Sequence, residues 1–570
     1  MSRWGATPVA AGRTRFTLWA PDRPEVTLEI DGHAPVAMDR AEDGWFSAEV
    51  PVGAGTRYRF RLDADLAVPD PASRAQAGGV NGWSVVVDPD SYRWATPDWR
   101  GRPWEEAVIE EVHVGVLGGF AGVAERLPAL ADLGITAIEL MPVNAFGGTR
   151  NWGYDGVLPY APAESYGSPD DLKALVDRAH GLGLMVFLDV VYNHFGPDGN
   201  YLGAYAREFF HEDVHTPWGG AVAVDAEPVH RFFVDNARMW LEEYRVDGLR
   251  FDAVHAIGNP AFLDRMAAEL REAVGQDRHV HLVLENEEND AERLAPGRYH
   301  AQWNDDFHNV LHVLLTGETS AYYQDFADRP AERLARCLSE GFIYQGEGSP
   351  NHDGKPRGSR SSHLPPTSFV AFLQNHDQVG NRAMGERLTL LAHPDKLRAA
   401  TALLLLGPQI PLLFMGDSEG SEAPFLFFTD FHDELADAVR EGRRKEFAKF
   451  QAFADPAARA RIPDPNAPAT SERSRPDPGP EADAWRALYR ELLGLRHAHI
   501  VPRLKGTRSL GAEAIGDGAV LARWQMGDGA RLTIALNLGD SPVAFPDLAN
   551  PLFARGEPGA PASVAVWMEA

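Results

Sequence analysis

The stretch GLRFDAVHAI, residues 248–257, decides the fold of this chain. Its first half is a short apolar run typical of a buried strand, but the run ends on Arg250 and Asp252. Barrels built from alternating strands and helices carry their functional side chains at the carboxyl ends of the strands. The stretch therefore predicts a barrel strand that presents an arginine and an aspartate at one rim.

The same alternation continues on both sides of this stretch. With residues 246–254, the strand candidates are 108–115, 135–143, 183–194, 280–288, 299–306, 367–377 and 410–417. Helical patterns lie between them at 121–134, 168–183, 230–245, 259–275 and 393–407, and Ser168 with Asp171 predicts a capped helix start. Eight such units predict an α/β fold, a (β/α)8 TIM barrel, because doubly wound sheets rarely reach this length.

Two regions rich in strand patterns flank the predicted barrel. Residues 13–95 alternate polar and apolar side chains in short runs, which predicts an antiparallel β-sandwich. Strand patterns return near the C-terminus. We expect an N-terminal β-sandwich at 1–95, a catalytic barrel at 96–503 with a proline-rich lid near 453–485, and a small C-terminal β domain at 504–570.

Composition narrows the possible classes of function. The formal net charge of −28 at pH 7 disfavours nucleic acid and anionic membranes as partners. A single cysteine, Cys337, excludes an intramolecular disulfide. The first residues lack an apolar signal region, and no run of about 18 apolar residues follows, so we expect a cytoplasmic protein.

Three acids and two histidines follow the apolar runs of the third, fourth, fifth and seventh strands: His194, Asp252, Glu285, His376 and Asp377. Because barrel strands end at one rim, we expect these side chains to converge there. A zinc site is the alternative for such residues, but neither an HExxH spacing nor a cysteine pair is present. We expect no metal and no organic cofactor.

Two facing carboxyl groups can cleave a glycosidic bond. In retaining enzymes they lie about 5–5.5 Å apart, one acting as nucleophile and the other as acid. Arg250 favours the ionised form of Asp252, as a nucleophile requires, and burial with acidic neighbours would raise the pKa of Glu285. The pattern favours a glycosidase, with a non-catalytic glycan-binding barrel as the alternative.

Four segments carry a family resemblance. VVYNH (190–194), GLRFDAVHAI (248–257), LVLENE (282–287) and FLQNHD (372–377) resemble, in this order, the signature regions of the α-amylase superfamily of glycoside hydrolases. The resemblance implies that Asp252 is the nucleophile, Glu285 the acid/base and Asp377 the acid that stabilises the transition state. With the NWGYDG segment and the neighbouring residues, the expected substrate contacts are Tyr154, Asp155, His194, Arg250, His255, His376, Asn381 and Arg382.

Aromatic side chains at strand ends also predict sugar contacts, because their faces pack on the C–H groups of a sugar. Trp303 is the first candidate, with Trp152 and Phe427 as others, although ordinary packing is an equal alternative. In the segment after Trp303, Asp305, Asp306 and His308 could bind sugar hydroxyls, with capping of the loop as the alternative.

Longer segments narrow the resemblance. Residues 151–184, 192–202 and 303–323, with FFTDF (427–431), EGRRKEF (441–447) and IPDPNA (462–467), are similar to the maltooligosyltrehalose trehalohydrolases. This resemblance implies hydrolysis of the α-1,4 bond next to the terminal trehalose of maltooligosyltrehalose, after a partner synthase has made that substrate. Glycogen branching enzymes share the layout, so glucan transfer is the alternative.

Two segments depart from the family pattern. HVGVLGGFAG (113–122) is shorter than usual after the first strand, and FMGDSEGSEAPF (414–425) lacks the acidic–aromatic pair expected after the eighth. Glu419 is either displaced or compensates for this loss, so we expect an altered grip on substrate at that side of the rim.

Overall fold

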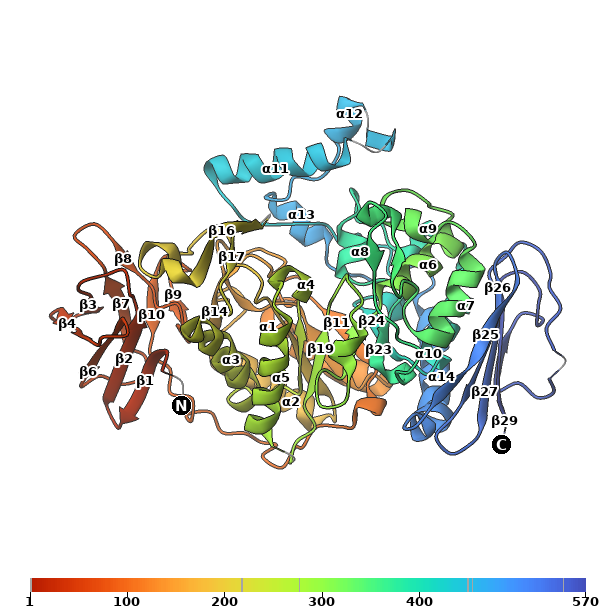
Figure 1. Ribbon diagram of the computed structural model, residues 1–570, viewed down its shortest axis with the longest axis horizontal. Coiled ribbons are helices and arrows are strands. Elements are labelled where there is room, and N and C mark those ends of the chain that lie inside the picture. Colours follow the sequence, from red (N-terminus) through yellow and green to blue (C-terminus); the bar gives the residue numbers. More distant parts are fainter. Residues whose placement is uncertain are drawn as a thin grey trace.

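The computed structural model describes residues 3–216, 219–275, 277–448, 451–453, 455–546 and 548–569. Three regions follow one another along its longest axis (Figure 1). The N-terminal strands lie at one end, the barrel and its helices lie in the middle, and the C-terminal sheet lies at the other end.

The N-terminal region contains two sheets. The first has the order β1 (Gly5–Ala10), β2 (Arg13–Trp19), β6 (Trp45–Val50) and β5 (Asp39–Arg40). The second contains β4 (Val36–Ala37), β3 (Thr27–Ile30), β7 (Arg57–Arg61), β10 (Trp83–Val85) and β9 (Gln76–Ala77), with β8 (Ala67–Val68) paired to β7. Phe16 of β2 and Tyr58 of β7 meet between the sheets with ring centroids 4.8 Å apart, which confirms the predicted sandwich.

Eight parallel strands form the closed barrel. In order they are β11 (Ile109–Val112), β12 (Ala137–Leu140), β15 (Met185–Val190), β18 (Gly248–Phe251), β19 (His281–Leu284), β20 (Ala301–Trp303), β23 (Phe369–Ala371) and β24 (Ile410–Phe414). Pairing of β24 with β11 closes the ring. Each strand lies inside one of the eight predicted segments, so the predicted barrel is confirmed.

Helices surround this barrel. The longer ones are α1 (Gly119–Leu133), α2 (Pro169–Gly181), α3 (Glu227–Glu242), α5 (Pro260–Val274), α6 (Asp305–Thr316), α7 (Pro330–Glu340), α10 (Pro394–Leu406) and α14 (Ala482–Leu495). The predicted cap is present at α2, where the Ser168 hydroxyl accepts a hydrogen bond from the Asp171 backbone N–H at 3.2 Å.

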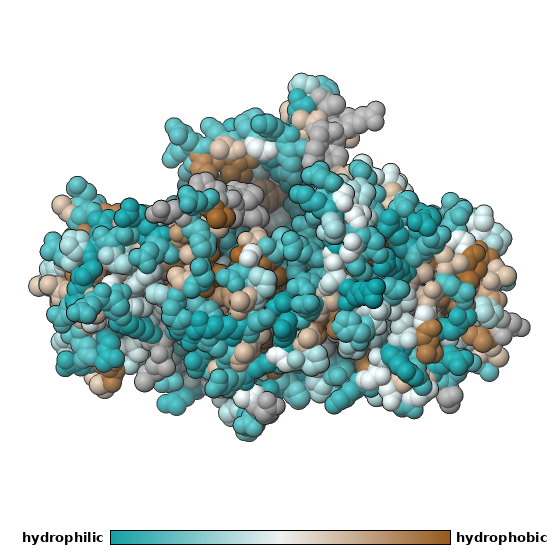
Figure 2. Space-filling model, viewed as in Figure 1, coloured by the Kyte–Doolittle hydropathy of each residue, from teal (hydrophilic) through white to brown (hydrophobic). Residues whose placement is uncertain are grey.

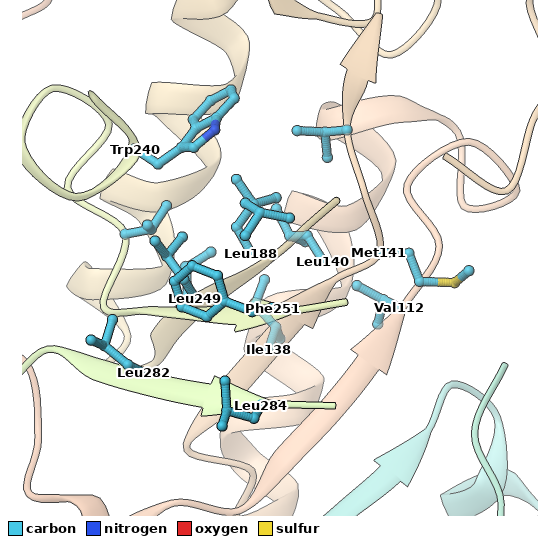
Figure 3. Close-up of a cluster of buried hydrophobic side chains, with 14 of the residues drawn as sticks. Val112, Ile138, Leu140, Met141, Leu188, Trp240, Leu249, Phe251, Leu282 and Leu284 are labelled. Carbon is cyan, nitrogen blue, oxygen red and sulfur yellow. The ribbon is translucent and has the colours of Figure 1, made fainter. Parts of the chain in front are cut away.

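Alternate residues of each strand face either the helices or the barrel interior. Leu249 and Phe251 of β18 join strand residues such as Leu188 and Trp240 of α3 in an apolar layer (Figure 3). Arg250, between Leu249 and Phe251, must point to the opposite side, into the barrel. This alternation delivers polar side chains to the interior just below the rim.

Smaller elements connect the barrel units at the carboxyl ends of the strands. They include the hairpin of β13 (Asn144–Phe146) and β14 (Gly156–Pro162), the hairpin of β16 (Phe210–Thr216) and β17 (Gly219–Val222), α4 (Val254–Ile257), β21 (Glu347–Gly348), β22 (Pro356–Arg357), α8 (His376–Gly380) and α9 (Leu388–Leu391). Short 3-10 turns at 202–204, 207–209, 291–294 and 321–326 belong to the same set.

After β24 the chain leaves the barrel and returns with α14. The excursion contains α11 (Asp433–Phe447), α12 (Pro456–Arg459) and α13 (Pro468–Arg473), which lie above the barrel on the same side as α8 and β16 (Figure 1). The proline-rich segment predicted as a lid is therefore part of a longer excursion that also includes α11.

The C-terminal sheet has the order β25 (Arg508–Gly516), β26 (Ala519–Gln525), β27 (Arg531–Asn537), β29 (Ser563–Glu569) and β28 (Phe553–Arg555), and it packs beside α7. This sheet confirms the predicted C-terminal β region. No helix in the described part of the chain has the length and apolar character needed to cross a membrane.

Candidate active site

Arg250 links two of the predicted acids at the carboxyl end of β18. Its fully buried guanidinium donates from Nη1 to Asp252 Oδ1 at 2.7 Å, and its Nη2 lies 3.9 Å from Glu285 Oε2. The second oxygen of Asp252 accepts a hydrogen bond from Asn193 Nδ2 at 3.2 Å. Because both oxygens are held, Asp252 has a fixed orientation at the rim, with 13% of its side chain exposed.

Glu285 lies next to this pair at the end of β19. Its Oε2 accepts the backbone N–H of Ala253 at 2.6 Å, and 14% of its side chain is exposed. Burial raises the pKa of Glu285; Arg250 opposes this shift, while the charges of Asp252 and Asp377 add to it. The carboxyl group therefore has the raised pKa that a proton donor needs.

Asp377 is carried by α8, the short helix that follows β23. Its side chain is 44% exposed, and its carboxylate lies 3.3 Å from His376 Nε2. Burial opposes ionisation of Asp377, but the charge and hydrogen bond of His376 lower its pKa. Asn381 Nδ2 also donates to Asp377 Oδ1 at 3.3 Å. Asp377 is thus an accessible carboxylate at the same rim as Glu285.

His376 is held in its charged form between two acids. Its Nδ1 lies 2.5 Å from Glu111 Oε1, and its backbone N–H donates to Glu111 Oε2 at 2.9 Å. Burial alone would lower the pKa of His376, but Glu111 and Asp377 together raise it well above its usual value. Tyr154 stacks on the imidazole ring with centroids 5.1 Å apart.

Asp189 is an interior acid that sequence reasoning missed. It accepts hydrogen bonds from Arg250 Nη1 at 2.6 Å and from the Tyr154 hydroxyl at 2.7 Å. Burial raises the pKa of Asp189 to about 7, although Arg250 opposes the shift. Asp189 ends the apolar run LMVFLD, which is the signal that could have identified it.

Glu111 and Glu139 complete this interior layer and were also missed. Both are 1% exposed, on β11 and β12. Burial and the charges of Asp189 and Glu111 raise the pKa of Glu139 well above its usual value, and its carboxyl oxygens have no hydrogen-bond partner among the described residues. Glutamates within VIEEV and AIEL resemble charges on a half-exposed strand, so neither residue stands out in the sequence.

Several predicted substrate contacts lie around the acids. His194 Nε2 lies 2.9 Å from the Tyr154 carbonyl, and Asp155 accepts from Asn151 Nδ2 at 2.6 Å. His255 keeps 25% of its side chain exposed beside Glu287. Asn381 is exposed. Arg382, in contrast, is held by two hydrogen bonds to Glu318 at 2.8 and 3.0 Å.

The structure does not bring three of the predicted contacts to the surface. Trp303 is 1% exposed and lies beneath Arg250, whose guanidinium is 4.2 Å from the ring centroid. Asp306 accepts from the Ile343 backbone N–H at 2.7 Å, and His308 Nδ1 lies 2.5 Å from the Leu373 carbonyl. These side chains are buried, and Asp306 and His308 bond to backbone groups, as the packing and capping alternatives expect. Their contact with sugar stays a prediction.

Asp305 behaves differently from its neighbour Asp306. It is only partly buried and accepts a hydrogen bond from Gln378 Nε2 of α8 at 3.2 Å. Burial and the charges of Glu285 and Asp377 raise its pKa well above the usual value. Asp305 therefore lies close to the catalytic acids.

Tyr322 is an exposed aromatic residue that sequence reasoning did not select. It lies in the 3-10 turn at 321–326 with 68% of the residue exposed. Partial desolvation, followed by the charges of Glu446 and Asp377, raises the pKa of Tyr322. The charges of Glu446 on α11 and of Asp377 therefore both act on the Tyr322 hydroxyl. Figure 2 shows the surface hollowed below α11, with hydrophobic side chains at the edge of the hollow.

The acidic side chains of the atypical segment after β24 bond to other protein groups. Glu419 is paired with Arg486 of α14 at 2.8 Å. Asp417 accepts from Gln374 Nε2 at 2.6 Å and from the Phe414 backbone N–H at 3.0 Å, and burial raises its pKa to about 6. The pairing directs Glu419 toward α14, and both outcomes expected for this residue stay predictions.

The fold and the rim define a glycosidase of the α-amylase class. Residues 81–216 match the family model described as the alpha amylase catalytic domain, and residues 507–567 match a domain of unknown function. The structure of a putative alpha amylase from Salmonella typhimurium is 47% identical, with a TM-score of 0.94 and full coverage of both chains. A pullulanase from Anoxybacillus, at 18% identity and a TM-score of 0.74, shares the fold.

Comparison with curated relatives identifies the family of the chain within this class. It is 40% identical to the malto-oligosyltrehalose trehalohydrolase of Deinococcus radiodurans, over 96% of this chain and 92% of the relative, and 39% identical to that of Rhizobium sp., over 95% and 93%. A branching enzyme from Pseudoalteromonas atlantica is 33% identical over 44% of this chain. The chain belongs to the malto-oligosyltrehalose trehalohydrolase family.

Proposed function

We propose that this chain hydrolyses the α-1,4-glucosidic bond next to the terminal trehalose of maltooligosyltrehalose, releasing trehalose and a maltooligosaccharide. The choice of substrate is supported by relatives that are named malto-oligosyltrehalose trehalohydrolase and that match this chain over nearly their whole length. The observation that carries the chemistry is the buried Arg250, which lies within 4 Å of carboxylate oxygens of both Asp252 and Glu285.

In the first step, Asp252 attacks the anomeric carbon and forms a covalent glycosyl ester, while the bond to the leaving trehalose oxygen breaks. Glu285 gives its proton to that oxygen, so no free alkoxide forms. In the second step, Glu285 takes a proton from water, and the resulting nucleophile releases the sugar from Asp252. The raised pKa of Glu285 supports its role as the proton donor.

Asp377 and His376 act on the same sugar ring. The lowered pKa of Asp377 keeps it ionised, so it can stabilise the positive charge that develops at the anomeric centre and hold ring hydroxyls. His376 is charged, and its Nδ1 faces Glu111 while its Nε2 faces Asp377. The Nε2–H group is therefore the one that can also donate a hydrogen bond to a sugar hydroxyl. Tyr154, stacked on His376, offers a ring face to the sugar.

Other rim residues recognise the rest of the substrate. Asp155, His194, His255 and Asn381 keep the substrate-binding roles expected from the sequence. Tyr322 joins them because its exposed ring can pack on a glucosyl unit beyond the acids. The reaction that supplies this substrate is that of a maltooligosyltrehalose synthase, which we propose as the functional partner.

The proposal is tested by comparing trehalose release from maltotriosyltrehalose with cleavage of maltopentaose. A strong preference for the first substrate is expected, and equal rates would indicate a general amylase instead. A branching enzyme would shift the iodine staining of amylose without releasing trehalose, so amylose serves as the second substrate in the same experiment.

A further inference from the structure

The excursion after β24 contains the segments FFTDF, EGRRKEF and IPDPNA, which the mechanism above does not use. We call the described residues between 425 and 473, which are 425–448, 451–453 and 455–473, the strap. Asn466 ties its parts together: Oδ1 accepts from Thr429 Oγ1 at 2.8 Å and from the Phe431 backbone N–H at 2.9 Å, and Nδ2 donates to the Ala436 carbonyl at 3.2 Å. The strap is therefore one unit with its own internal contacts.

One attachment of the strap is to the loop that leads to Tyr154. Asp430 accepts from the Thr149 backbone N–H at 2.8 Å and from its hydroxyl at 2.9 Å, and it pairs with Arg150. The Trp152 indole donates to the Leu426 carbonyl at 2.8 Å. The strap thus fixes the segment 149–152, which ends two residues before Tyr154.

The other attachment is to α8, which carries Asp377. Arg443 of α11 donates from Nη2 to the carbonyls of Gly380 at 2.7 Å and Arg382 at 3.1 Å. These carbonyls flank Asn381, whose side chain donates to Asp377. The end of a helix favours a cation, because its last carbonyls lack intrahelical partners.

Arg443 is well suited to this attachment. Only 8% of its side chain is exposed, and its guanidinium lies 5.3 Å from the ring centroid of Phe427 and 4.7 Å from that of Phe447. Leaving a buried guanidinium without acceptors costs free energy. The two hydrogen bonds from Arg443 therefore restrain the carbonyl groups of Gly380 and Arg382. α8 has only five residues and needs such outside contacts, because so short a helix is not stable alone.

We propose that Arg443 is a positioning residue for the glycosidase reaction: by joining the docked strap to the end of α8, it fixes Asp377 relative to the sugar. The inference rests on the proposed function. The strap spans both walls of the site, since Asp430 holds the Tyr154 loop and Arg443 holds the Asp377 helix. Neither residue touches the substrate in this account.

The test compares Arg443→Gln and Arg443→Lys with Arg444→Gln. Arg444 is the next residue on α11 and pairs with Glu441 at 3.1 Å, so its variant loses the same charge without affecting α8. We would measure kcat and KM for trehalose release from maltotriosyltrehalose, hydrolysis of α-maltotriosyl fluoride, and thermal unfolding. Arg443→Gln should lower kcat on both substrates by about 30-fold or more, since small displacements of catalytic groups carry such losses. Arg443→Lys should recover part of kcat.

The result that overturns the proposal is a kcat of Arg443→Gln equal to that of Arg444→Gln, or a loss confined to KM. If Arg443→Gln does not fold, Arg443→Lys against Arg444→Lys decides in the same way, and an unchanged kcat contradicts the proposal. Failure of the proposed function is distinguishable, because wild-type protein would then release no trehalose while the fluoride comparison still tests Arg443.

Discussion

Arg250 is fully buried and lies within reach of three carboxyl groups, those of Asp189, Asp252 and Glu285. A buried charge is tolerated only when it is paired and hydrogen-bonded, and here the pairing also serves the reaction. The same guanidinium orients Asp252 and, through Asp189, the hydroxyl of Tyr154. Arg250 therefore determines how the acidic side chains around the end of β18 are arranged.

The protonation of Glu285 predicts the alkaline side of the pH profile. Because burial raises its pKa, Glu285 stays protonated to higher pH than an ordinary glutamate, and kcat/KM should fall only as pH rises through that raised pKa. Glu285→Gln should remove this alkaline limb and lower kcat/KM for maltotriosyltrehalose by about 10²–10⁴-fold. Hydrolysis of α-maltotriosyl fluoride, whose leaving group needs no proton, should fall far less. An equal loss on both substrates would contradict the assignment of Glu285 as the acid.

At the scale of single residues, the sequence identified Asp252, Glu285 and Asp377 as candidates, because each follows a recognisable apolar run. It could not separate exposed from buried neighbours. Asp305 and Asp306 are adjacent, yet one lies near the acids and the other bonds to the Ile343 backbone. Which face of α6 meets the opening depends on packing between distant segments. The burial of Trp303 depends on the same packing, so the sequence could not decide between its two expected roles.

Among the elements, the barrel strands were the most predictable, since apolar runs separated by helical periods identify them. The short helices α4 and α8 were not predicted, because four or five residues give no period. Their positions matter most for the site. Ala253, which precedes α4, has a φ of 41°, and its N–H bonds to Glu285. Tertiary contacts determine such turns.

The capping box of α2 gives a prediction of stability at the scale of the element. Ser168→Ala removes the side-chain acceptor for the Asp171 N–H and should lower the unfolding free energy by about 0.5–2 kcal/mol. Urea unfolding measures this loss, with Ser168→Thr as the variant that keeps an acceptor. kcat should stay unchanged, because α2 carries none of the rim residues. Equal stability of the alanine and wild-type proteins would refute the role of the cap.

Across the whole molecule, the order of sandwich, barrel and C-terminal sheet followed from changes in periodicity. The domain boundaries at 95 and 503 and the cytoplasmic location stay predictions. The strap could not be recognised as a unit from sequence, because its attachments join residues about 60 to 280 apart, as in Arg443–Gly380 and Asp430–Thr149.

Aromatic contacts join the N-terminal sandwich to the barrel. Trp4 lies 4.6 Å from Trp45 within the sandwich and 4.9 Å from Phe232 of α3, measured between ring centroids. Trp4→Ala should therefore destabilise both regions, by about 3–5 kcal/mol for a buried tryptophan. Differential scanning calorimetry should show one transition that shifts as a whole. Two separate transitions, with only the first moved by the substitution, would show that the sandwich unfolds independently.

The central claim is that Asp252 forms a covalent bond to the sugar. Incubating Glu285→Gln with 5-fluoro-α-maltosyl fluoride should trap that ester, since the fluoride leaves without acid and the slowed second step lacks its base. Peptide mass spectrometry should then find one added glycosyl group, on the peptide that contains Asp252. Label on a different carboxylate, or unlabelled protein that turns over with inversion at the anomeric carbon, would contradict the account.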